Sequence, residues 1–192
     1  MSTEGRTGME NRNTAAVPGT RGQIYDLMLT GLMAAIVMAA TSFFRIPVIA
    51  TNGYIHLGDA MVFLSVLILG RRNGTIAAAS GSALADLLGG YAHWVPWTFI
   101  IKGLMAFICG TILLSGKDKE KNVSAFRSAA AMAAGALVMM AGYFIVQRFM
   151  YGTWAAPLAA LPGNIAQGAA GVMIAEILSA AIKKTAPNMM KN

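Results

Sequence analysis

The sequence predicts an all-α integral membrane protein, a bundle of six transmembrane helices with both termini on the cytoplasmic side. Three observations support this prediction. The chain is 56% hydrophobic and only 12% charged, about half the charged fraction of a typical soluble domain, so charged side chains cannot cover its surface. Long apolar runs alternate with short polar clusters. The basic residues collect in alternate loops, as membrane topology requires.

Six apolar segments account for the predicted helices. A bilayer core about 30 Å thick needs about 20 helical residues to cross it. The second segment is short for a full span, so it either begins near Gly53 or does not cross completely. The polar cluster 71–74 predicts a tight turn after it, and Pro96 and Pro162 fall near the starts of the fourth and sixth segments, where a helix tolerates proline. The segments are 25–44, 57–70, 74–90, 96–115, 125–147 and 162–182.

The remaining chain forms two short tails around this membrane domain, which we place at 23–184. Residues 1–22 are polar, rich in Gly, Thr, Asn and Arg, and predict a disordered cytoplasmic tail; residues 185–192 form the second tail. The first apolar run begins too late for an ordinary cleaved signal peptide. The single cysteine, Cys109, lies in an apolar run, which excludes an internal disulfide and indicates a small buried residue.

The distribution of Lys and Arg orients the helices. With the N-terminus inside, 12 of the 15 basic residues fall in inner loops or tails, two (Arg45 and Arg148) in outer loops, and Lys102 within a segment. This bias favours six segments with both ends in the cytoplasm, and five segments would break the alternation. The net charge of +7 therefore reflects topology and not a nucleic-acid partner, because the basic residues lie between apolar runs.

This topology places most polar residues of the membrane segments in the outer half. Ionisable groups in lipid are costly and usually face a cavity or a partner. We therefore predict an outward-opening pocket among the last three segments, closed by the first outer loop that ends near Asp59. The candidate substrate-binding residues are Tyr54, His56, Asp86, His93, Trp94, Trp97, Lys102, Tyr143, Gln147, Asn164 and Gln167.

Structural roles are open for the aromatic and charged candidates. Trp94 and Trp97 can belong to an interfacial aromatic belt. Lys102 can snorkel to the outer surface, and Asp59 can favour the N-terminus of its helix. These alternatives need no ligand.

The other polar candidates have structural alternatives too. Asp86 can pair with Arg45 or Arg148, and Asn164 and Gln167, three residues apart on one helix face, can join helices by hydrogen bonds. The two histidines, His56 and His93, lack the Cys or carboxylate pattern of a metal site, so we predict neither a metal nor a cofactor.

A strip of small residues lies on the first segment. Gly31, Ala35 and Ala39 recur every four residues, and such a strip lets another helix approach closely. The neighbour is either a helix of this chain or an external partner, and the pattern alone leaves both open.

Other function classes find weaker support. The chain has no G-x-x-x-x-G-K-[ST] loop for ATP. An intramembrane serine hydrolase using Ser80 or Ser82 with His93 is a rival, although nothing fixes their geometry. A stand-alone secondary transporter is another, although six segments are few for two inverted halves.

Five motifs in order resemble the S components of energy-coupling factor (ECF) transporters, and most closely the riboflavin-type S-component family. That family also includes proteins assigned to pyridoxine or hydroxymethylpyrimidine uptake. The motifs are Y-I-H-L-G-D-A (54–60), G-S-A-L-A-D-L-L-G-G-Y (81–91), W-V-P-W (94–97), I-I-K-G-L-M (100–105) and L-P-G-N-I-A-Q (161–167).

The resemblance implies a non-enzymatic vitamin-binding subunit in the bacterial cytoplasmic membrane. Such subunits have six helices and bind their vitamin from outside, with the first outer loop and the last three helices. They dock on a transmembrane coupling subunit driven by two cytoplasmic ATPases, and are thought to topple to release the ligand inward. Docking uses an Ala-x-x-x-Ala strip on the first helix, which Ala35 and Ala39 match.

Overall fold

The computed structural model describes residues 20–43, 45–49, 52–114 and 124–186. The predicted tails therefore lie outside the described residues, except for 20–22 and 185–186. Of these residues, 20–22 begin the first helix and Thr185 ends the last one.

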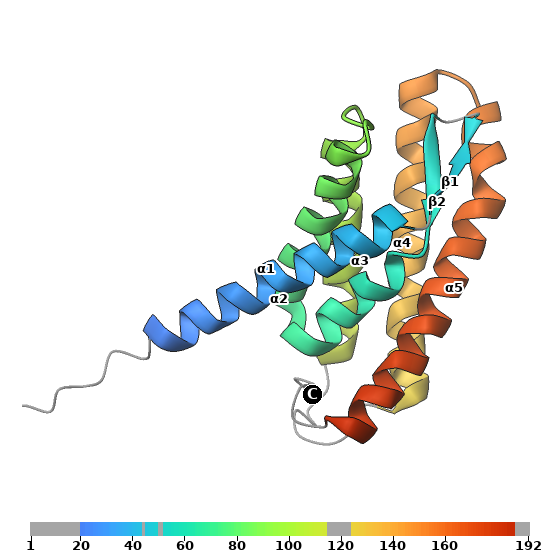
Figure 1. Ribbon diagram of the computed structural model, residues 1–192. Coiled ribbons are helices and arrows are strands. Elements are labelled where there is room, and N and C mark those ends of the chain that lie inside the picture. The colour runs from blue at the N-terminus through green and yellow to red at the C-terminus, as the bar shows by residue number, and fades with distance from the viewer. Residues whose placement is uncertain (1–19, 44, 50–51, 115–123, 187–192) are drawn as a thin grey trace, which may run out of the picture.

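The described chain is a helical bundle with one small sheet (Figure 1). Its five helices are each long and apolar enough to cross a membrane. The elements are α1 (Thr20–Phe43), β1 (Arg45–Val48), β2 (Gly53–His56), α2 (Asp59–Leu88), α3 (Val95–Leu114), α4 (Ala125–Tyr151) and α5 (Ala155–Thr185).

The difference between five helices and the predicted six lies in α2, which covers both predicted segments 57–70 and 74–90. Its backbone leaves the helical region at Gly70 (φ 79°, ψ 178°), a conformation that only glycine adopts readily. The two arms meet closely beyond the break: Ser65 Oγ donates to the Gly74 carbonyl at 3.0 Å, and a Cβ on Gly74 would lie 2.6 Å from the Cα of Val66. A count of six separate helices is not confirmed.

The small sheet is a feature that the all-α prediction missed. Strands β1 and β2 pair antiparallel, with Arg45 opposite His56 and Val48 opposite Gly53. Four-residue strands give too few alternations to be read from sequence. Ile55 on β2 packs directly against Gly163 of α5, where a side chain would leave no room for it. The hairpin therefore rests on α5 at the end of the bundle where α4 and α5 connect (Figure 1).

Of the two prolines predicted to lie near helix starts, only one does so. Pro96 is the second residue of α3, as expected. Pro162 lies inside α5, because that helix begins at Ala155, seven residues before the predicted start. The sequence placed the start at the proline, whereas the helix begins directly after the short connection that follows α4.

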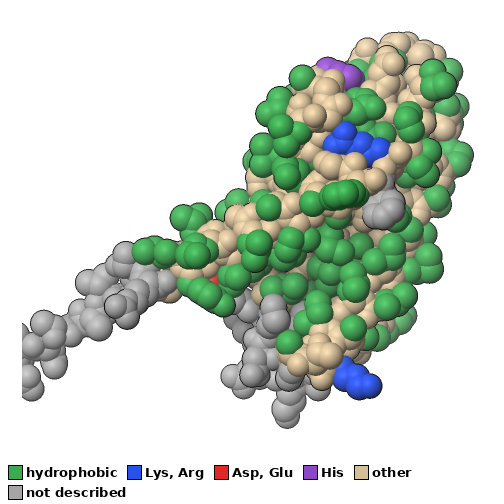
Figure 2. Space-filling model, viewed as in Figure 1, with side chains coloured by type: hydrophobic (Ala, Val, Ile, Leu, Met, Phe, Trp, Pro, Cys, Tyr) green, Lys and Arg blue, Asp and Glu red, His purple; other side chains and the backbone are tan. Residues whose placement is uncertain are grey.

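The core lies between α2, α3 and α4, and α1 crosses α2 at a slant (Figure 1). Met33 and Val37 are the buried apolar residues of α1, and the glycine at position 81 of α2 lets the two backbones meet near Ala34. Apolar side chains also cover much of the outer surface (Figure 2), including Phe126, Phe149 and Ile177. An apolar exterior of this kind suits a lipid surrounding.

Candidate functional site

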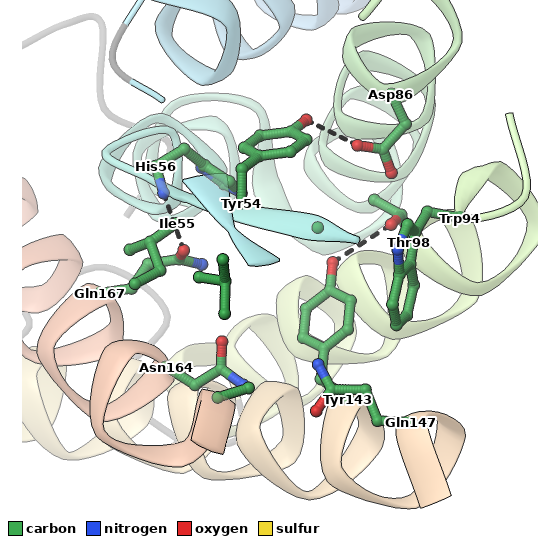
Figure 3. Close-up of a pocket in the computed structure, with 13 residues that line it drawn as sticks. Tyr54, Ile55, His56, Asp86, Trp94, Thr98, Tyr143, Gln147, Asn164 and Gln167 are labelled. Atoms are coloured by element: carbon green, nitrogen blue, oxygen red, sulfur yellow. Dashed lines mark hydrogen bonds between the residues drawn. The ribbon is translucent and has the colours of Figure 1, made fainter. Parts of the chain in front are cut away.

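A hollow of about 490 Å³, counted out to its open mouth, lies between β2 and one end of the helices (Figure 3). Strand β2 forms one side, and α2, α3, α4 and α5 each contribute side chains. It is lined by Val48, Gly53, Tyr54, Ile55, His56, Asp86, Trp94, Thr98, Tyr143, Gln147, Ala160, Asn164 and Gln167.

The hollow brings together eight of the eleven predicted binding residues, which come from β2, α2, the turn before α3, α4 and α5. The other three do not line it: His93 is exposed, Trp97 is 40% exposed, and Lys102 is fully buried behind it. The structure therefore does not bring these three side chains to the hollow. His93 lies in the turn before α3 and Trp97 on an exposed position of that helix, whereas Lys102 lies one turn beyond Thr98.

Lys102 belongs to a buried polar network beneath the hollow. Its Nζ forms an ion pair with Asp59, and both side chains are 0% exposed. Gln167 Nε2 donates to the other Asp59 oxygen at 2.9 Å, and the backbone N–H of His56 donates to Gln167 Oε1 at 2.9 Å. The network joins α2, α3, α5 and the hairpin, and it rules out the alternative in which Lys102 snorkels to the surface.

His56 connects this network to the hollow. Its Nδ1 accepts a hydrogen bond from the Gly58 N–H at 3.0 Å, so the ring proton sits on Nε2. Burial, and then the nearby Lys102 charge, lower the pKa of the imidazole to about 3. His56 is therefore neutral at physiological pH.

Tyr54 and Arg45 fix the hairpin to the end of α2. The Tyr54 hydroxyl donates to Asp86 Oδ1 at 2.6 Å, a length typical of a bond to a carboxylate; burial, and then the Asp86 charge, raise the pKa of the Tyr54 phenol. Arg45 lies over the Tyr54 ring, 4.6 Å from its centroid, and donates to the Ala85 carbonyl at 2.8 Å. Asp86 thus binds a tyrosine and not the arginines considered from sequence; Arg148 lies over the Trp154 ring.

The aromatic wall consists of Trp94 and Tyr143, whose ring centroids lie 5.8 Å apart in an edge-to-face arrangement. The hydroxyls of Tyr143 and Thr98 are 3.2 Å apart (Figure 3). Trp94 is only 4% exposed, so it does not belong to an interfacial belt. Trp97 is exposed enough to fit that alternative.

Three buried polar atoms of the lining residues have no hydrogen-bond partner among the described residues. They are Asp86 Oδ2, Trp94 Nε1 and Gln147 Oε1. Leaving such an atom unsatisfied costs about 1–3 kcal/mol. All three belong to residues that line the same hollow.

Comparison with known proteins decides the family. The family profile described as the S component of the ECF-type riboflavin transporter matches residues 21–184. The chain belongs to this S-component family. The S component is thus a substrate-binding membrane subunit and not an enzyme, which excludes the serine hydrolase. The geometry agrees, since Ser80 donates to the Ile76 carbonyl of its own helix and the His93 ring lies beside Trp94.

Individual relatives support the assignment. The S component is 30% identical over 163 residues to the thiamine precursor transporter HmpT of Lactococcus lactis subsp. cremoris (strain MG1363), covering 84% of this chain and 90% of HmpT. It is 32% identical over 148 residues to an uncharacterized protein of Pyrococcus woesei, covering 77% and 95% of the two chains. The crystal structure of a biotin S component from an ECF-type ABC transporter has the same fold, with a TM-score of 0.63, 18% identity, and coverage of 84% and 94%.

The sequence reasoning missed five lining residues of this S component. Thr98 and Ala160 lie four residues from Trp94 and Asn164 respectively, so helical spacing from predicted residues could have found them. The other three, Val48, Gly53 and Ile55, enter the hollow only because the hairpin folds over it. No sequence signal for that hairpin was available.

The small-residue strip of α1 lies mostly on the outer side of the S component. Gly31 and Ala35 are exposed, and Ala39 is half-buried. A side chain on Gly31 would meet nothing within 4 Å. The α2-facing side of α1 is instead formed by Met33 and Val37, so the strip is not the internal packing face.

Proposed function

We propose that this S component captures a water-soluble vitamin or vitamin precursor with a flat ring from outside the cell, and delivers it through an ATP-driven coupling module. The observation that carries the proposal is the hollow itself. It combines an aromatic wall with three unpaired polar atoms, all buried, and a ligand would satisfy those atoms while its ring packs on Trp94 or Tyr143.

The proposed ligand is riboflavin, pyridoxine or a hydroxymethylpyrimidine-like precursor. The family description supports the first, and HmpT, which is named as a thiamine precursor transporter, supports the last. Of the residues predicted to hold the polar edge of the ligand, Asn164 and Gln167 line the hollow. Lys102 is not proposed as a ligand contact, because its charge is paired with Asp59.

We further propose six membrane passes with both termini in the cytoplasm, the two arms of α2 forming the second and third. Arg71 and Arg72 follow the break at Gly70, and Lys183 and Lys184 end α5; in this orientation all four lie on the inner side. The hollow, at the opposite end of α3 and α5, then opens outward.

The coupling partner is proposed to dock on α1. Gly31, Ala35 and Ala39 form a strip with little cover from this chain, and small residues allow close helix approach in a membrane. The partners are a transmembrane coupling subunit and two cytoplasmic ATPases, in the cytoplasmic membrane of a bacterium.

The test is identification of the bound molecule. The full chain, purified in mild detergent, is extracted and its small molecules are identified by mass spectrometry, beside a Tyr143→Ala, Asn164→Ala variant purified in the same way. We expect a flat vitamin or precursor with the wild type and its loss from the variant. Retention of the same molecule by the variant, or its absence from both, contradicts the proposal.

A further inference from the structure

The charge of the hollow limits which ligand it can accept. Among the described residues that line it, none is Lys or Arg, and Asp86 is the only Asp or Glu. His56 is neutral, as its hydrogen bond from Gly58 and its low pKa indicate. The lining therefore carries one negative group and no positive one.

The two nearest cations are held elsewhere. Lys102 lies beneath Tyr143, with its Nζ 5.5 Å from the ring centroid, and its charge is paired with Asp59. Arg45 lies over the Tyr54 ring and is bound to the Ala85 carbonyl and to Ser42 Oγ. Neither side chain lines the hollow, so neither offers a contact to a bound anion.

The unpaired atoms define what the ligand must offer. Asp86 is 4% exposed, and its Oδ1 accepts a hydrogen bond from Tyr54. Its Oδ2 lies beside the Thr98 hydroxyl but accepts no well-formed hydrogen bond from the described residues. Trp94 is 4% exposed, and its indole N–H is also without a partner there. A carboxylate oxygen only accepts and an indole N–H only donates. The matching ligand carries an N–H or O–H group and an acceptor atom.

We infer that the hollow selects an uncharged or cationic heterocycle that donates to Asp86 and accepts from Trp94, and that it rejects the phosphorylated form of the same molecule. This inference rests on the proposed function and narrows it. Asp86 is the specificity-determining residue: it attracts a donor and repels a phosphate, an effect that a buried site amplifies.

The test uses three matched pairs of probes: hydroxymethylpyrimidine, pyridoxine and riboflavin, each beside its own monophosphate. Affinities for the purified full-length protein are measured by calorimetric titration. We expect the unphosphorylated member of at least one pair to bind and its phosphate to bind about 100-fold more weakly or worse, the effect of a second negative charge several ångströms from a buried carboxylate.

Variants separate charge from size. Asp86→Asn keeps the shape of the side chain and removes its charge. We expect it to weaken binding of the unphosphorylated probe and to reduce the affinity ratio between that probe and its phosphate at least about tenfold. Trp94→Phe removes the indole N–H and part of the aromatic surface without changing any charge, so it should weaken both members of a pair alike. Glu176→Gln is the matched control, the same carboxyl-to-amide change on α5, nine residues beyond Gln167 and outside the lining; its discrimination should equal that of the wild type.

The outcomes are distinguishable. Equal or tighter binding of the phosphates by the wild type overturns the inference and leaves the proposed function standing. Unchanged discrimination in a folded Asp86→Asn protein also overturns it, because size and not charge then decides. If none of the six probes binds, the proposed function and the inference both fail. Should Asp86→Asn not fold, Asp86→Ser takes its place, with the same expected and overturning results.

Discussion

Replacing Lys102 by methionine tests whether this lysine serves the fold or the ligand. Both partners of the Lys102–Asp59 pair are 0% exposed, so the substitution leaves a buried carboxylate with Gln167 as its remaining hydrogen-bond donor. Breaking such a pair costs about 3–5 kcal/mol. We expect the free energy of unfolding to fall by that amount.

The double variant Asp59→Asn, Lys102→Met is the decisive companion. It removes both charges and keeps an amide beside Gln167, and a neutral replacement of a buried pair often restores stability. We expect the double variant to recover most of the loss, with a coupling of at least about 2 kcal/mol between the two sites in a double-mutant cycle.

Unfolding of the purified variants in detergent, followed by tryptophan fluorescence against denaturant, measures these energies. Ligand affinity is measured in parallel on folded protein. Additive single effects would show that the two side chains do not depend on each other. A Lys102→Met protein of normal stability and reduced affinity would place the lysine in the binding site and refute the reasoning.

Three further predictions follow from the same structure. Because burial holds the pKa of His56 at about 3, the unfolded chain takes up a proton below about pH 6.5 that the folded chain refuses; stability should fall as the pH drops from there towards 3, by up to about 1.4 kcal/mol per pH unit. Thermal unfolding measures this, and His56→Gln should remove that part of the pH dependence. Ala35→Trp should preserve ligand binding but stop uptake by cells that express the coupling module, with Ile36→Trp, exposed and about 100° around the same helix from Ala35, as control; lost binding would make the strip internal packing. Gly81→Val should lower the thermal unfolding midpoint, since its side chain meets Ala34 and Val37 of α1, whereas Gly31→Val, in open space, should not.

Much of the helical architecture could be predicted because apolar run length and basic-residue placement are properties of the sequence itself. Four of the five helices coincide with one predicted segment each. The interruption of α2 could be located only approximately: the polar cluster 71–74 marked it, but the residue that leaves helical geometry is Gly70. The hairpin was missed because its strands are four residues long and are stabilised by contacts with α2 and α5.

The candidate site could be predicted as a set of residues but not as a geometry. The predicted topology assigned a depth to each polar side chain, and Tyr54, Asp86, Tyr143 and Gln167, which it placed at similar depth, line one hollow. It could not give the direction in which a side chain points. Lys102 has the right depth, yet it turns towards Asp59, a partner 43 positions away.

The central claim, that a ligand occupies this hollow from the outside, is tested most directly by ligand protection of a cysteine placed in it. In a Cys109→Ala background, Asn164→Cys is alkylated with a membrane-impermeant reagent on intact cells, with and without the molecule that co-purifies. We predict labelling that the ligand slows tenfold or more, while the exposed control Thr153→Cys is labelled at the same rate in both conditions. Labelling of Asn164→Cys at an unchanged rate in the presence of saturating ligand would contradict the account.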